Sequence, residues 1–378
     1  LKELVKLRNQ AAVQLGFKNF HAMQLYLNEQ DEKELMALFD ELDELTREPF
    51  QFAKKDIDNR LAKSYQIPVT ALGPWHYHDP FFQQTPSVFA ANLDAPYEKL
   101  DLLAVTNDFY NSIALPIADV RARSDLFEKK GKSPHAFCID IDREGDVRVL
   151  ANVVGNEYWM STLLHEFGHA VYSSKNIPRE LPYVLRSEAH ILTTEGIAMM
   201  FERLAKKRAW IEKMGGKVPD AKTFDEAAAR TQRYQLLIFS RWCQVMLRFE
   251  KGMYENPDQD LSDLWWSLVE KYQGIKRPKD RKAPDYASKI HIVSAPVYYH
   301  NYMMGELFAS QLHHAIAKEV YEGADPGTVI YFNNEKVGKF LKDKVFAPGK
   351  KMKWNDLTKF ATGAPLSAKS FAEDFKGK

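Results

Sequence analysis

Three features are scarce in this chain of 378 residues, and each scarcity excludes a class of protein. Only two cysteines occur, Cys138 and Cys243, both in apolar segments rather than in spaced pairs, so we expect no disulfide framework. No apolar run approaches the roughly 20 residues needed to cross a bilayer, so we expect no membrane span. The net charge is also small, because 52 Lys and Arg balance 51 Asp and Glu. Since no excess of positive charge is available to attract phosphates, we expect no nucleic-acid partner.

What the chain has in abundance is apolar residues at helical spacing. The segments 35–45 and 236–249 show this pattern most clearly, and hydrophobic residues make up 45% of the chain. We therefore predict a mainly α-helical protein, with helices capped at Asp31 and Ser262. The chain enters a helical pattern directly at Leu1, so we expect an upstream segment, and the sequence indicates neither a compartment nor an oligomeric state.

One segment departs from the helical pattern. Residues 136–142 and 147–153 alternate apolar and polar side chains on either side of Glu144-Gly145, which predicts a β-hairpin. Residues 67–86, 274–285 and 347–353 are rich in polar residues, proline or glycine, and we predict loops there. The basic run 276–282 is interrupted by proline and aspartate, which favours a solvated loop over a binding patch.

The clearest chemical motif is His165-Glu166-x-x-His169, within a helical pattern at residues 160–175. Positions one helical turn apart share a face, so two imidazoles can bind one zinc ion while Glu166 lies beside it and activates a water molecule. Zinc needs a third protein ligand, and the spacing alone leaves Glu188, His190 and Glu195 open. The amphipathic helix expected around Glu195 favours that residue.

The sequence resembles the angiotensin-converting-enzyme-like family of peptidyl-dipeptidases and, more distantly, the thimet oligopeptidase and oligoendopeptidase F families. In the first family the zinc helix is followed by Leu-Pro, an arginine and then a glutamate ligand, which Leu181-Pro182, Arg186 and Glu195 match. The resemblance selects Glu195 and implies one Zn²⁺ ion. It also implies a helical zincin-type peptidase with a deep central cleft, a small hairpin beside the zinc helix, and a single catalytic domain of two helical halves over residues 1–378. The family's N-terminal lid of helices is expected upstream of Leu1.

The resemblance also assigns roles outside the zinc motif. His135-Ala136 matches a strand edge that holds the substrate backbone, and Lys289-Ile290-His291 precedes the pair Tyr299 and Tyr302 as in the family. The resemblance implies that Tyr302 and His291 donate hydrogen bonds to the oxyanion. It implies that Lys289 and Tyr299 bind the C-terminal carboxylate of the substrate.

Three positions depart from the family pattern. Trp75 is followed by His76 rather than by the glutamine that helps bind the carboxylate. Met199 stands where an aspartate orients a zinc histidine, so Glu202 or Glu188 has to substitute. Asn301 replaces an arginine used for chloride, so we do not expect strong chloride activation.

Together these features predict a zinc metallopeptidase that hydrolyses short peptides and releases C-terminal dipeptides. An oligoendopeptidase or a carboxypeptidase with the same zinc chemistry is the first alternative. An inactive peptide-binding relative, or a fragment too short to work, is the second.

Overall fold

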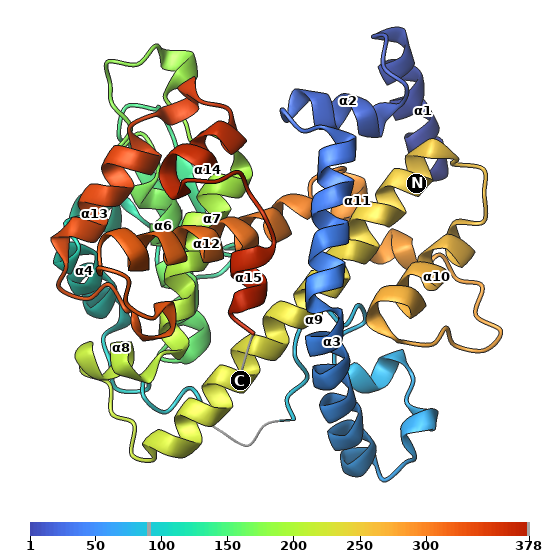
Figure 1. The fold of residues 1–378 in the computed structure, drawn as a ribbon, viewed down its shortest axis with the longest axis horizontal. Coiled ribbons are helices and arrows are strands. Elements are labelled where there is room, and N and C mark those ends of the chain that lie inside the picture. The colour runs from blue at the N-terminus through green and yellow to red at the C-terminus, as the bar shows by residue number, and fades with distance from the viewer. Residues whose placement is uncertain (89–91, 376–378) are drawn as a thin grey trace. The chain divides into compact units, whose positions relative to one another are not determined.

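The computed structural model describes residues 1–88 and 92–375, and helices make up most of it (Figure 1). The chain divides into two compact units: the first contains residues 1–89, 233–303 and 375–378, and the second contains residues 90–232 and 304–374. The long helices α9 (Ala221–Glu255) and α12 (His300–Glu319) each belong in part to both units. The mainly α-helical class is confirmed, whereas a single catalytic domain stays a prediction.

The first unit is built around α3 and the C-terminal part of α9. Asp31 caps α3 by accepting hydrogen bonds from the backbone of Lys33 and Glu34, as predicted. The side-chain amide of Gln244 on α9 donates to the carbonyl of Phe39 on α3, and both residues are fully buried. The helices of this unit, besides α9 and α12, are α1 (Lys2–Gln14), α2 (Phe20–Leu27), α3 (Glu32–Tyr65), α10 (Leu261–Gln273) and α11 (Ile290–Ser294).

The predicted cap at Ser262 is wrong by two residues. Helix α10 begins at Leu261, and the carboxylate of Asp260 accepts hydrogen bonds from the backbone N–H groups of Ser262 and Asp263. A carboxylate at this position also interacts favourably with the positive end of the helix dipole, which a serine hydroxyl does less well. The three predicted loops are confirmed as connections that contain at most short 3₁₀ turns.

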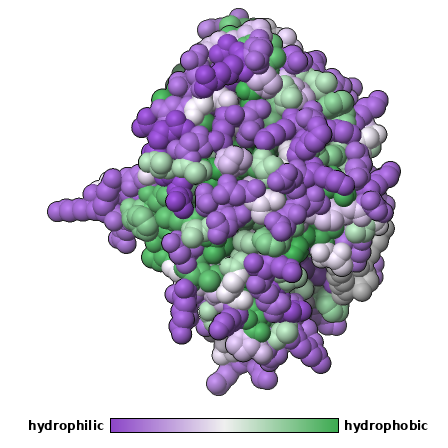
Figure 2. Space-filling view, turned by 90° about the vertical axis from the view of Figure 1, so that its left-hand side faces the viewer, coloured by the Kyte–Doolittle hydropathy of each residue, from purple (hydrophilic) through white to green (hydrophobic). Residues whose placement is uncertain are grey.

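The second unit surrounds a central pair of helices, α6 (Glu157–Val171) and α7 (Ile191–Glu202). Ten of the twelve residues of α7 are buried, which is the pattern of a helix enclosed on all sides. The remaining helices of this unit are α4 (Leu102–Ser112), α5 (Ala118–Arg123), α8 (Arg208–Lys213), α13 (Glu335–Leu341), α14 (Trp354–Thr362) and α15 (Lys369–Glu373). The face of this unit in Figure 2 is mostly hydrophilic, with hydrophobic residues exposed only in patches.

The predicted hairpin is confirmed. Strands β1 (Phe137–Asp140) and β2 (Val147–Leu150) pair antiparallel, with Cys138 opposite Val149, and both strands pack against α6. Both cysteines are free thiols, so no disulfide holds the fold. Among the described residues, no helix is long and apolar enough to span a bilayer.

Candidate active site

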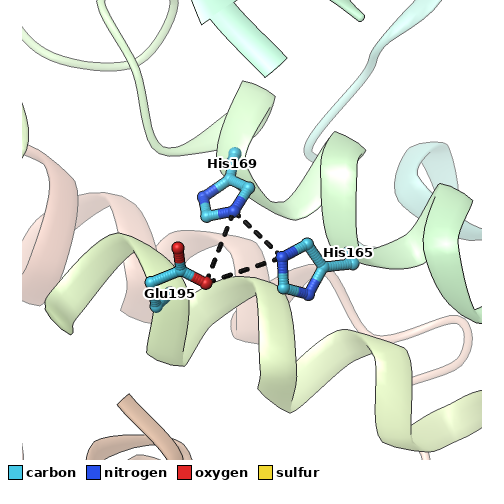
Figure 3. A group of neighbouring side chains, drawn as sticks. All are labelled: His165, His169 and Glu195. Atoms are coloured by element: carbon cyan, nitrogen blue, oxygen red, sulfur yellow. Dashed lines mark hydrogen bonds and ion pairs between the residues drawn. The ribbon is translucent and has the colours of Figure 1, made fainter. Parts of the chain in front are cut away.

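Helix α6 presents the two motif histidines on one face. The side chain of Asn156 caps the helix by accepting from the backbone N–H of Trp159 at 2.8 Å, which fixes where the helix begins. His165 and His169 then lie one turn apart and point toward Glu195, which α7 carries in its second turn (Figure 3). The helix ends at Val171, four residues before the end of the predicted pattern.

Glycines let the helices around this site approach closely. A Cβ atom on Gly168 of α6 would lie 2.8 Å from Cα of Ala198 on α7, so any larger residue there would push the two helices apart. Gly305 of α12 lies against α7 in the same way, because a Cβ atom there would be 3.0 Å from Cβ of Glu195. The position of Glu195 relative to the two histidines is therefore set by backbone packing.

The three side chains fit a metal ion. His165 Nε2 lies 3.1 Å from His169 Nε2, and Oε2 of Glu195 lies 3.6 Å and 3.9 Å from these two atoms. The point equidistant from the corners of a triangle with these edges is about 2.1 Å from each atom. Zinc bonds to histidine nitrogen and carboxylate oxygen are about 2.0–2.2 Å long. Oε2 of Glu195 is also buried and has no hydrogen-bond partner among the residues that the structure describes, as expected of a ligand atom that binds a cation.

The second nitrogen of each histidine has its own partner. Nδ1 of His165 lies 2.5 Å from Oε2 of Glu202, and Nδ1 of His169 lies 2.8 Å from the hydroxyl of Thr194. These contacts fix the orientation of both rings and leave the two Nε2 atoms facing each other. Of the two candidates to replace the aspartate missing at Met199, the structure thus places Glu202, and not Glu188, at a motif histidine.

The rival third ligands lie elsewhere. Nδ1 of His190 accepts a hydrogen bond from the backbone of Leu192, so this residue caps α7. Glu188 is influenced by the charges of Asp140, Arg143 and Lys350, and burial raises its pKa to about 7. The structure therefore brings Glu195, rather than His190 or Glu188, to the two histidines.

Electrostatics around the three side chains favour a cation. Burial opposes protonation of His165, yet the negative charges of Glu202, Glu195 and Glu166 outweigh that effect and raise its pKa to about 10. Burial, together with the charge on His165, holds the pKa of His169 well below its usual value. Burial raises the pKa of Glu195 to about 7. A site that gathers this much negative charge out of water is stabilised by a bound dication.

Strand β1 passes Glu166 with its unpaired edge. The N–H of Ile141 donates to the carbonyl of Asp146 in the hairpin, so alternate residues, among them Ala136 and Cys138, direct their backbone groups away from β2. Burial raises the pKa of the Glu166 carboxyl, and a hydrogen bond from the backbone of Cys138 opposes that shift. His135 and Ala136 directly precede the strand, and His135 is exposed. The edge that carries Ala136 and Cys138 therefore leads to Glu166.

The first unit gathers a second group of predicted residues, around Lys289. Its ammonium group donates to the side-chain oxygen of Gln83 at 2.7 Å, and the hydroxyl of Tyr299 donates to the same oxygen at 3.2 Å. Burial lowers the pKa of Lys289, and among the described residues no carboxylate forms an ion pair with it. We call Gln83, Lys289 and Tyr299 the anchor cluster.

The sequence did not predict Gln83, because the family pattern places a glutamine directly after the tryptophan, where this chain has His76. The carboxylate of Asp79 accepts hydrogen bonds from the backbone of Phe81 and Gln83, and this turn directs Gln83 toward Lys289. The signal available in the sequence was a glutamine pair within an aromatic loop, Phe81-Phe82-Gln83-Gln84.

His291 and Tyr302 lie beside the anchor cluster. The ring of His291 is 4.9 Å from that of Tyr299 and 6.2 Å from that of Tyr302. Within residues 1–88 and 92–375, its buried Nδ1 has no hydrogen-bond partner. A buried carboxyl, Glu250, accepts from the backbone of Val297 at 2.8 Å, and Val297 has a φ of 57°. This conformation is strained for a β-branched side chain, and it shapes the turn that leads into the tyrosine pair.

Comparison with known proteins agrees with this geometry. The family model described as angiotensin-converting enzyme matches residues 1–377. The angiotensin-converting enzyme of Mesocricetus auratus is 24% identical over 373 residues, which cover 91% of this chain and 28% of that protein. The enzyme of the same name from Theromyzon tessulatum is 22% identical over 291 residues, which cover 74% of this chain and 47% of that protein. The chain thus spans less than half the length of these relatives, and it belongs to the angiotensin-converting enzyme family.

Proposed function

We propose that this protein is a zinc metallopeptidase that removes dipeptides from the C-terminus of short peptides. The observation that carries the proposal is the triangle formed by His165, His169 and Glu195, which has a common point at zinc-bond distance from all three. Family membership supports the same chemistry. His165, His169 and Glu195 would hold one zinc ion, which would supply Lewis-acid chemistry: a lowered pKa of a bound water molecule and polarisation of the scissile carbonyl.

Glu166 is the proposed general base. The residue follows His165 directly on α6 and is 8% exposed, so it is held in a largely dry environment. In hydrolysis it takes the proton of the attacking water and passes that proton to the leaving amine. Glu202 and Thr194 hold the two imidazoles in the orientation that keeps both Nε2 atoms available.

The edge of β1 is the proposed site for the substrate backbone. An extended peptide can add to this edge through main-chain hydrogen bonds with Ala136. His135 is the residue that precedes Ala136 at the start of the edge. The backbone N–H of Cys138 on the same edge reaches Glu166, so a peptide that pairs along β1 passes the base. This arrangement supports recognition of the peptide backbone without demands on the side chains.

The anchor cluster is the proposed site for the C-terminal carboxylate. Lys289 is a buried cation that is bound to a neutral amide oxygen, and Tyr299 and Gln83 add hydrogen-bond donors beside it. A carboxylate is the ligand that this set of donors fits. We assign Tyr302 and His291 the role of donating hydrogen bonds to the oxyanion, as the family resemblance implies.

The test is a digest of a peptide library followed by mass spectrometry. Stepwise appearance of C-terminal dipeptides supports the proposal, and internal cuts that ignore the C-terminus favour an oligoendopeptidase instead. The Glu166→Gln variant is the control for chemistry: we expect it to keep one zinc ion per chain and to hydrolyse a quenched peptide about 10³-fold more slowly. Undiminished hydrolysis by this variant would contradict the assignment of the base.

A further inference from the structure

The first unit contains a cavity of about 490 Å³ that the proposed peptidase chemistry does not use. Its floor consists of the buried side chains Trp242, Trp265, Trp266 and Val269, contributed by α9 and α10. The rings of Trp242 and Trp265 meet edge to face, with centroids 5.7 Å apart. This volume lies within the range of pockets that bind small molecules, and the floor is almost entirely aromatic. We call it the aromatic cavity.

Two loops form the walls of the aromatic cavity. The first, residues 74–82, is fixed to α10 because the side-chain amide of Gln273 donates to the carbonyls of Phe81 and Phe82, both at 2.9 Å. The second, residues 275–288, includes the basic run of the sequence. There Asp285 pairs with Arg281 and accepts from the indole N–H of Trp266 at 3.1 Å. These rim charges neutralise each other.

We propose that the aromatic cavity binds a small uncharged molecule of one or two fused aromatic rings. Flat walls of tryptophan and phenylalanine favour a planar ligand, because stacked and edge-to-face rings gain more than their buried area alone. Arg281 and Asp285 form an ion pair with each other, and the carboxylate of Asp79, which also lines the cavity, accepts hydrogen bonds from the backbone of Phe81 and Gln83. A charged ligand therefore gains little from the ionised side chains of the lining. Removal of apolar ring surface from water supplies the driving force.

The aromatic cavity also adjoins the anchor cluster. Gln83 follows the first loop and Lys289 follows the second, and these two residues form the 2.7 Å hydrogen bond of the cluster. The ammonium of Lys289 lies 5.2 Å and 5.3 Å from the ring centroids of Phe81 and Trp242, which line the cavity. An occupant that displaces the ring of Phe81 or Trp242 therefore disturbs the packing around the Lys289 ammonium and weakens carboxylate binding. This second step rests on the proposed function.

Binding itself is tested on the full chain with 2-naphthol as the probe, by isothermal titration calorimetry. We expect one saturable site in the unmodified protein and at least tenfold weaker binding in Val269→Phe, because the added ring fills the floor. Ile275→Phe, at a second buried lining residue, gives the same result if the first variant is unstable. Val13→Phe, the same change at an exposed position on α1, is the matched control and binds as the unmodified protein does. Absence of saturable binding, or equal binding by all variants, overturns the proposal.

The coupling to the anchor cluster is tested by hydrolysis of two matched quenched peptides, one with a free C-terminal carboxylate and one amidated. Saturating 2-naphthol raises the KM for the free peptide several-fold and leaves that of the amide unchanged, and Val269→Phe abolishes this effect. An unchanged KM in the presence of bound probe overturns the coupling. If the protein hydrolyses neither peptide but still binds the probe, the proposed function is overturned. The proposal that the aromatic cavity binds a small aromatic molecule is then still supported.

Discussion

The two units hold their functional side chains in different ways. In the second unit, the proposed metal ligands and their partners come from two packed helices, within 37 residues of sequence from His165 to Glu202. In the first unit, Gln83 comes from an aspartate-capped turn, Lys289 from the residue that precedes α11, and Tyr299 from the segment that follows the strained residue Val297. The metal site is thus set by helix packing, and the anchor by loops and single hydrogen bonds.

This difference suggests a division between chemistry and selectivity. A site fixed by close helix contacts, such as that of Gly168 with Ala198, has one geometry, and a change there is expected to remove the metal. A site on loops can change while the chemistry is retained. The predictions below test this division, in order of their expected effect on activity.

The largest effect is expected from His169→Ala. Removal of one nitrogen from the triangle leaves two ligands, so we expect loss of bound zinc and a fall in peptide hydrolysis of about 10⁴-fold or more. His190→Ala is the matched control, because His190 caps α7 by accepting from the backbone N–H of Leu192; it keeps zinc and loses about 1 kcal/mol of stability. Metal content by mass spectrometry and the rate on a quenched peptide check both variants. Loss of zinc in His190→Ala alone would reverse the ligand assignment.

The next largest effect is expected from Lys289→Met. Loss of the buried ammonium lowers kcat/KM about 100-fold for a peptide with a free C-terminus, because a charge-assisted hydrogen bond is lost. The amidated peptide is affected far less, and zinc content is unchanged because the metal ligands belong to the second unit. Lys279→Met, at an exposed position of the basic loop, serves as control and changes neither rate. Equal losses on both peptides would show that Lys289 does not act as the anchor.

A smaller effect is expected from Glu202→Gln. The amide still reaches Nδ1 of His165 but no longer carries a negative charge, so zinc affinity falls about 10–100-fold. Activity returns when zinc is added in excess. Glu188→Gln removes a carboxylate from the same unit and leaves zinc affinity unchanged, and the two variants are compared by competition with a chelator. A normal zinc affinity in Glu202→Gln would contradict a positioning role.

The smallest effect on activity, and a clear one on stability, is expected from Glu250→Gln. Burial raises the pKa of Glu250 to about 8, from an ordinary value near 4.5. The folded chain therefore holds a proton that the unfolded chain releases, and stability falls as pH rises from about 4.5 to about 8. The difference in unfolding free energy between the unmodified protein and the variant should shift by on the order of a few kcal/mol across this range. Denaturant titrations at pH 5, 6, 7 and 8 measure it. A difference in unfolding free energy that does not change with pH would show that Glu250 is ionised in the folded chain.

The metal site could be predicted from sequence because helix geometry is regular. Once His165 and His169 are on a helix, their spacing alone places them on one face, and the structure shows this register. Glu188 and Glu202 both lie seven residues from Glu195, but only Glu202 lies on the helix that carries Glu195, which the apolar pattern after Glu195 already indicated. The hairpin register was readable because its alternation is regular as well.

Loop positions could not be predicted in this way. Gln83 reaches Lys289 because the side chain of Asp79 accepts hydrogen bonds from two backbone N–H groups. A turn of this kind cannot be predicted from the spacing of apolar residues. The cap of α10 was misplaced because Asp260 and Ser262 are both acceptable caps and local spacing does not separate them. The roles of His135, Ala136, His291, Tyr299 and Tyr302 rest on family resemblance and stay predictions.

The proposed pairing of the substrate with the edge of β1 has a consequence for which peptides can be cut. Main-chain pairing demands an extended chain, so a segment that is helical or tightly turned has to unfold before it can lie beside Ala136 and Cys138. Proline lacks a backbone N–H, so a proline that faces one of these backbone carbonyls cannot donate the main-chain hydrogen bond that any other residue donates there. Resistance to digestion should therefore track the shape and the prolines of a peptide more closely than the size or charge of its side chains.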